Sequence, residues 1–67
     1  MPETVLTARE REILLLLADG VARKDLAKTI YVSNNTVKTH LRRINVKLGT
    51  GNAVTALARA QELGLLS

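Results

Sequence analysis

Apolar residues recur along the chain at the three- and four-residue spacings of amphipathic helices, and no stretch shows the alternation of a half-buried strand. The clearest stripe places aliphatic side chains on one helical face: Val37, Leu41, Ile44 and Leu48. Short polar or glycine-containing turns separate the helical segments. The pattern therefore predicts an all-α, four-helix domain with helices over about residues 8–18, 23–30, 34–48 and 53–63.

The residues at the segment ends support these boundaries. Thr7 and Glu10 have the spacing of a capping box, in which each side chain bonds the other residue's backbone amide. Ser33 and Asn52 are expected to cap the third and fourth helices, whereas Ala22 cannot cap the second. Glycines follow three of the helices and fit left-handed C-terminal positions: Gly20, Gly49 and Gly64, with Leu65 expected to fold back on the last turn.

Composition and charge limit the class of protein. A chain of 67 residues allows one small domain, residues 1–67, of which residues 1–5 resemble a frayed lead-in. Without cysteine there is no disulfide framework and no thiolate metal site, so a reducing cytoplasm is expected and no cofactor is predicted. The longest apolar run, residues 13–18, is too short to cross a bilayer, and no signal-peptide pattern precedes it.

The net charge of +4 and the pI of about 10.1 favour a polyanionic partner, with nucleic acid first and an anionic membrane surface second. One tyrosine and no phenylalanine or tryptophan argue against a module that stacks bases on aromatic side chains.

The second and third segments have the layout of a helix-turn-helix. A helix over 23–30 is followed by the three-residue turn 31–33 and then by the longer helix 34–48. Ala27 supplies the small residue that a close helix crossing needs, and Val37 offers a core contact at the start of the longer helix. This spacing is moderately specific, because alanine and valine are common.

The helix over 34–48 divides into faces at about 100° per residue. Opposite the core stripe lie side chains that suit base edges, namely Asn35, Lys38, Thr39 and Arg42, together with Val46. Along one flank lie residues that suit phosphates: Thr36, His40, Arg43 and Lys47. No acidic residue stands between residues 33 and 48, and Arg23 and Lys24 add positive charge where the second helix would cross a DNA backbone.

Simpler interpretations exist for each feature. Lys38 and Arg42 could belong to a solvated helix face, and Ser33 is first a cap and only secondarily a phosphate contact. Residues 9–12 are most simply an exposed first turn. The alanine-rich face of helix 53–63 must partly complete the core, and its surplus could pack against a second copy. No catalytic constellation or metal-spaced cluster is present, so an enzyme is not expected.

The stretches "LTAREREILLLLADG", "KDLAKTIYVSNNTVKTHLRRINVKLG" and "ALARAQELGLL" resemble the LuxR-type (GerE-type) DNA-binding domain of NarL/FixJ response regulators and, more weakly, of MalT-type regulators. The resemblance covers residues 6–66. It implies a C-terminal output module of a larger bacterial transcription regulator, located in the cytoplasm with the nucleoid. It also implies a homodimer on double-stranded DNA, joined near Val54 and Leu57, with RNA polymerase as a further candidate partner.

The resemblance implies base contacts at Lys38, Thr39 and Arg42 with Asn35 beside them, and phosphate contacts at Thr36, His40, Arg43, Lys47 and near Lys24. The chain departs from the family pattern at Ala22, Tyr31, Gly51 and Ala53. At Tyr31 the family often has glycine, so the turn is expected to hold a strained tyrosine with positive φ.

The prediction is thus sequence-specific DNA binding with the third helix in the major groove. The alternatives are a helical protein-interaction module that has lost DNA binding and a sigma-factor-like promoter-reading domain.

Overall fold

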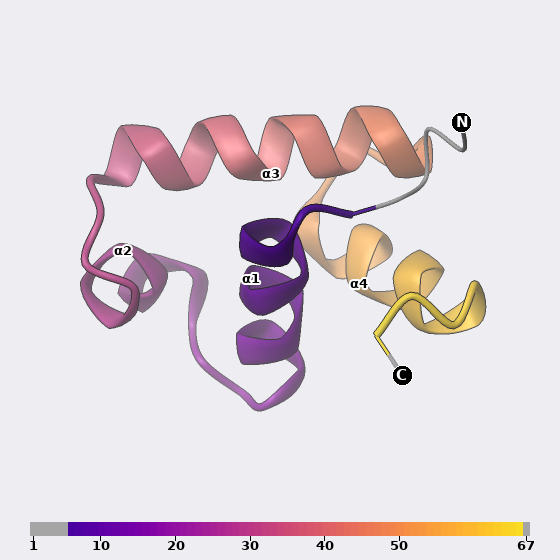
Figure 1. The fold of residues 1–67 in the computed structure, drawn as a ribbon, viewed down its shortest axis with the longest axis horizontal. Helices are drawn as coiled ribbons and strands as arrows, with labels where there is room; N and C mark the ends of the chain where they lie inside the picture. Colours follow the sequence, from indigo (N-terminus) through magenta and orange to yellow (C-terminus); the bar gives the residue numbers. More distant parts are fainter. Residues whose placement is uncertain (1–5, 67) are drawn as a thin grey trace.

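The computed structural model describes residues 6–66. Its elements are α1 (Ala8–Ala18), the 3-10 turn η1 (Arg23–Asp25), α2 (Leu26–Thr29), α3 (Asn34–Leu48) and α4 (Ala53–Glu62). No strand occurs among the described residues, so the predicted all-α fold is confirmed. In Figure 1, α3 runs along the long axis of the molecule, and α1, α2 and α4 all lie on one side of it.

The core forms where α3 meets the other helices. α3 packs against α1, α2 and α4, and α1 also packs against α4. The predicted stripe on α3 is almost completely buried, with no member more than 4% exposed: Val37, Leu41, Ile44 and Leu48. The core also contains five residues with no exposed surface, Ile13, Leu14, Leu26, Ala56 and Ala60, together with the buried Ala27 and Ile30. Burial of the stripe fixes the orientation of α3 about its own axis, and its opposite face is therefore left outside.

The predicted caps are present. The Thr7 hydroxyl accepts from the Glu10 amide at 3.1 Å, and the Glu10 carboxylate accepts from the Thr7 amide at 2.9 Å. Ser33 accepts from the Thr36 amide at 3.1 Å and Asn52 accepts from the Thr55 amide at 2.9 Å. The three glycines after the helices all have positive φ: Gly20, Gly49 and Gly64. These local interactions set where α1, α3 and α4 begin and end.

The segment predicted as one helix over residues 23–30 is not a continuous α-helix. It begins as the 3-10 turn η1, in which the Asp25 amide bonds the Ala22 carbonyl at 2.9 Å, and only Leu26–Thr29 is α-helical. Ala22 provides no side-chain cap, as expected. With no side-chain acceptor for the first amides, the tighter i to i+3 bond satisfies one of them instead.

Tyr31 ends α2 in the left-handed conformation, with φ of 59°. The Val32 amide bonds back to the Ala27 carbonyl at 2.9 Å, which is the hydrogen bond expected after a left-handed residue at a helix end. The prediction of positive φ at this residue is confirmed. The Tyr31 ring makes little packing contact, because the residue is 93% exposed.

The first turn of α1 differs from the prediction at one residue. Residues 9–12 were expected to be exposed, but Glu10 is only 2% exposed. The sequence gives no sign of this burial, because it depends on where α3 crosses α1. The frayed lead-in expected for residues 1–5 lies outside the described residues.

Candidate nucleic-acid interface

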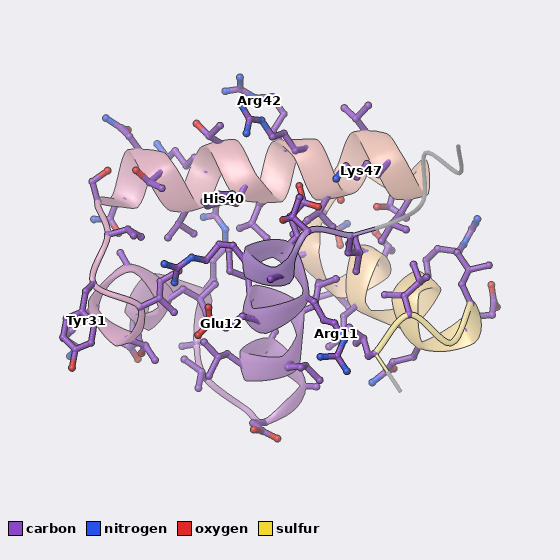
Figure 2. All side chains as sticks on the ribbon, in the orientation of Figure 1. Arg11, Glu12, Tyr31, His40, Arg42 and Lys47 are labelled. Atoms are coloured by element: carbon purple, nitrogen blue, oxygen red, sulfur yellow. The ribbon has the colours of Figure 1, made fainter. Side chains whose placement is uncertain are left out.

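The face of α3 opposite the core carries the side chains predicted to meet base edges. Asn35, Lys38 and Arg42 are exposed and Thr39 is half-buried. Figure 2 shows Arg42 projecting from the side of α3 that faces away from α1 and α4. The Thr39 hydroxyl donates to the Asn35 carbonyl at 3.0 Å. The fold therefore brings together all four residues that the helical pattern had grouped.

All but one of the residues predicted to contact phosphates lie along one flank of α3 or at its start. Arg43 is exposed, whereas Thr36, His40 and Lys47 are half-buried. His40 lies on the side of α3 that is turned toward α1 (Figure 2). The Ser33 and Thr36 side-chain oxygens are 2.9 Å apart, so the cap also holds the Thr36 hydroxyl in place. Lys24, the remaining member of this set, is exposed on η1.

Lys47 differs from the other members because its ammonium already has an acidic partner. Its Nζ donates to Oε1 of Glu10 at 2.6 Å. Burial by itself raises the pKa of Glu10, but the hydrogen bonds from Lys47 and Thr7 and the charge of Lys47 outweigh it, so the net pKa is lowered. Lys47 therefore has a structural contact in addition to the phosphate contact predicted for it.

A shallow groove that is largely open to solvent runs along the other flank of α3. Its volume is about 470 Å³, and α3, η1 and the turn between α3 and α4 together provide its lining, which includes Arg23, Lys38, Arg42, Asn45, Val46 and Thr50. Among its lining residues there is no acidic side chain. Asn45 and Thr50 were not anticipated as site residues. The position of Asn45 on the helical wheel, beside Lys38, could have indicated that Asn45 lines the groove. Thr50 lines it only because of the path that the turn after α3 takes, which the sequence does not show.

The apolar residues of α4 are divided between its core-facing side and its exposed side. Ala56 and Ala60 complete the core with no exposed surface, whereas Val54 is 78% exposed. Leu57 is half-buried and joins Leu17, Ala53 and Val54 around an apolar pocket of about 140 Å³. The dimer contact predicted at Val54 and Leu57 thus corresponds to an accessible apolar surface.

Within residues 6–66, no group of three or more histidine, cysteine, aspartate or glutamate side chains is arranged to hold a metal ion. None of the helices in this same part of the chain has the length and apolar character needed to span a membrane.

Comparisons with known proteins show the family to which the chain belongs. Residues 4–60 match the family described as bacterial regulatory proteins of the luxR family. A probable transcriptional regulatory protein NarL from Mycobacterium tuberculosis is 44% identical over 62 residues, which cover 92% of this chain and 29% of that protein. The chain therefore corresponds to only a part of the length of this curated relative.

Solved structures share the arrangement of helices. The transcription factor GerE has 36% sequence identity and a TM-score of 0.82, with 94% of each chain covered. The response regulator ChrA of a heme-sensing two-component system has 42% identity and a TM-score of 0.87, over 97% of this chain and 32% of that one. The chain belongs to the LuxR family of bacterial regulatory proteins and is a DNA-binding helix-turn-helix domain of that family.

Proposed function

We propose that this domain binds double-stranded DNA in a sequence-specific manner, with α3 lying in the major groove. The observation that carries the proposal is the division of α3 into a buried stripe and an opposite face with Asn35, Lys38, Thr39 and Arg42. Lys38 and Arg42 donate to guanine, Asn35 pairs with adenine, and the Thr39 methyl touches thymine. The charge of α3 favours its contact with DNA, because no acidic residue occurs in this helix to repel the phosphates.

Phosphate contacts hold the domain in register on the duplex. The residues assigned to them are Lys24, Ser33, Thr36, His40, Arg43 and Lys47. Of these, Arg43 and Lys24 are exposed cations, and the cap at Ser33 holds the Thr36 hydroxyl. These contacts add affinity for any duplex without selecting a sequence.

Two copies bind together, through Val54 and Leu57 of α4, to two half-sites about one helical turn apart. The exposed Val54 and the apolar pocket beside it support this arrangement. The domain is the C-terminal module of a larger regulator in the bacterial cytoplasm, associated with the nucleoid, and RNA polymerase is a further partner. The isolated domain is expected to be mostly monomeric without DNA and to bind weakly. Its role is recognition, not catalysis.

The test is a selection from random duplexes with a covalently dimerised form of the domain, followed by titrations at several salt concentrations. The proposal predicts one enriched sequence and a log affinity that falls with log salt by about 0.9 per phosphate neutralised. Absence of duplex binding at low salt, with the helical circular-dichroism signal intact, favours a protein-interaction module. Binding that requires RNA polymerase core enzyme favours a promoter-reading domain instead.

A further inference from the structure

The one large aromatic side chain of this protein lies on its surface. The sequence has a single tyrosine and no phenylalanine or tryptophan. An aromatic ring in the core of so small a domain would bury a large apolar area. Tyr31 is instead 93% exposed, and its ring projects outward beside α2 (Figure 2). The ring therefore adds little to the stability of the fold.

The backbone at Tyr31 is also unfavourable for a tyrosine. Its φ of 59° lies in the left-handed region, which glycine adopts without strain and a residue with a Cβ does not. Strained residues of this kind are found mainly where they serve a function. Because neither packing nor backbone geometry accounts for a tyrosine at this turn, its ring is available for a contact outside the domain.

The surroundings of Tyr31 are positively charged. Lys28 lies three positions before Tyr31 on α2, and Lys24 lies four positions before Lys28 on η1. All three side chains are exposed. Between residues 20 and 49 the sequence has one acidic residue, Asp25, and it is half-buried. An exposed ring with neighbouring cations is complementary to an acidic surface that also offers an apolar contact.

The location of Tyr31 separates it from the DNA and dimer contacts proposed above. Arg42 and Tyr31 project toward different sides of the molecule (Figure 2). α2 lies at one end of α3, and α4, which carries the proposed dimer contact, lies toward the other (Figure 1). A duplex on the outer face of α3 and a second copy on α4 would both leave the Tyr31 ring uncovered.

The ring favours a protein partner over a nucleic acid. Aromatic side chains stack on the bases of single strands, whereas the bases of a duplex are already stacked on one another. Tyrosine is enriched at protein interfaces, because its ring supplies apolar contact and its hydroxyl remains polar. One ring and one neighbouring cation give a small contact, however, and a small contact is effective only when the partner is held nearby, for example on the same DNA.

We propose that Tyr31 and Lys28 form a docking surface for an acidic surface of RNA polymerase bound to the same duplex. The Tyr31 ring is the apolar anchor, and Lys28 pairs with a carboxylate of the polymerase. The inference rests on the proposed function, because DNA binding brings the two proteins together. It also gives a reason for the strained tyrosine, since the left-handed backbone directs an exposed ring away from the core.

The test measures the affinity of RNA polymerase holoenzyme for duplexes that carry the selected sites beside a promoter at a series of spacings. Gel-shift titrations are made without the domain and with the covalently dimerised domain at saturation. We expect the unaltered domain to raise the polymerase affinity about tenfold at one spacing or more. Tyr31→Gly and Tyr31→Asn should remove most of this increase, whereas Tyr31→Phe, which keeps the ring, should retain it. Glycine and asparagine both tolerate positive φ, and circular dichroism checks that the fold is intact.

Charge variants test the second part of the docking surface. Lys28→Gln should reduce the increase a few-fold at low salt and by less at high salt, and Lys28→Arg should retain it. Arg59→Gln is the matched control, because it removes an exposed cation of α4. It should behave like the unaltered domain. None of these variants should change the affinity for the duplex alone by more than about twofold.

Three outcomes overturn the inference while the unaltered domain still binds its selected duplex. The domain fails to raise polymerase affinity at every spacing, or Tyr31→Gly keeps the full increase. The third is a loss of duplex affinity in Tyr31→Gly without polymerase, which would place the ring against DNA. Failure of the unaltered domain to bind any duplex overturns the proposed function itself, so the two failures are distinguishable.

Discussion

The ammonium of Lys47 lies 2.6 Å from Oε1 of Glu10 and joins the C-terminal part of α3 to the first turn of α1. Glu10 is 2% exposed, and the same oxygen accepts the Thr7 amide at 2.9 Å. One carboxylate therefore caps α1 and also holds α3 against it. Because α3 is the proposed recognition helix, we expect loss of this pair to alter the position of that helix relative to α1.

Replacing Lys47 with methionine should destabilise the domain, because the buried carboxylate of Glu10 would lose its charged partner. We expect the free energy of unfolding to fall by roughly 2–4 kcal/mol, below the largest values for such pairs because the Lys47 side chain is 27% exposed. Urea denaturation followed by circular dichroism measures the change. Arg43→Met is the matched control on the same helix and should change stability by less than about 0.5 kcal/mol. Equal effects of the two variants would show that the pair contributes no more than a surface charge.

Glu10 should also make stability depend on pH in the acid range. Its pKa in the folded protein lies below the ordinary value of 4.5, so the folded state binds the proton less readily than the unfolded state. The contribution of Glu10 is therefore fully present above about pH 4.5 and is lost as the pH falls through the lowered folded-state pKa. Thermal unfolding measured between pH 7 and pH 2 should show a steeper acid decline for the unaltered chain than for Glu10→Gln. Parallel declines in the two proteins would contradict this assignment.

Much of the fold could be predicted from the sequence because it depends on local interactions. The capping box at Thr7 and Glu10, the caps at Ser33 and Asn52, and the stripe on α3 each involve residues within a few turns of one another. Hydrogen-bonding side chains at helix starts and helical spacing of apolar residues fix such features. The base-facing set on α3 follows from the same spacing.

The features that were missed depend on contacts between distant segments. Glu10 and Lys47 are 37 positions apart, and the burial of Glu10 appears only when α1 crosses α3. The groove likewise requires η1 and the turn after α3 to flank one side of that helix. The start of the second helix could be predicted only in part. The sequence shows that Ala22 cannot cap this helix, but it does not show that residues 23–25 form a 3-10 turn as a result. Local patterns therefore identified the exposed face of α3 but not the segments that surround it.

Substitutions on the exposed face of α3 should separate base recognition from phosphate binding. Lys38→Ala and Arg42→Ala should each relax the preference at particular base pairs, with a loss of about 1–3 kcal/mol on the selected duplex. Arg43→Ala should instead weaken binding to selected and random duplexes by the same factor. Competition titrations against single-base variants of the selected duplex measure both effects. If all three variants lose affinity equally for every sequence, the base-facing assignment of Lys38 and Arg42 is wrong.

A charge at Val54 should disrupt pairing of two domains on DNA. Val54 is 78% exposed beside the apolar pocket of α4, so Val54→Lys would place an ammonium in the proposed contact without disturbing the core. We expect cooperative binding to two half-sites to be lost while affinity for one half-site is kept. Gel-shift titrations on duplexes with one and two half-sites measure this. Gln61→Lys adds the same charge at another exposed position of α4 and should leave cooperativity intact. Cooperativity that survives Val54→Lys would place the dimer contact elsewhere.

Tyr31 should be replaceable by glycine with a gain in stability. Its φ of 59° is unfavourable for a residue with a Cβ, and its ring is 93% exposed and contributes little packing. Relief of this strain, about 1–2 kcal/mol, exceeds the roughly 0.4–1 kcal/mol that glycine loses through a more flexible unfolded chain. We therefore expect Tyr31→Gly to raise the free energy of unfolding by about 0.5–1 kcal/mol, measured by urea denaturation. Tyr31→Val, with a β-branched side chain at the same φ, should lower it. A glycine variant less stable than the unaltered chain would mean that the tyrosine ring makes a stabilising contact that outweighs the backbone strain.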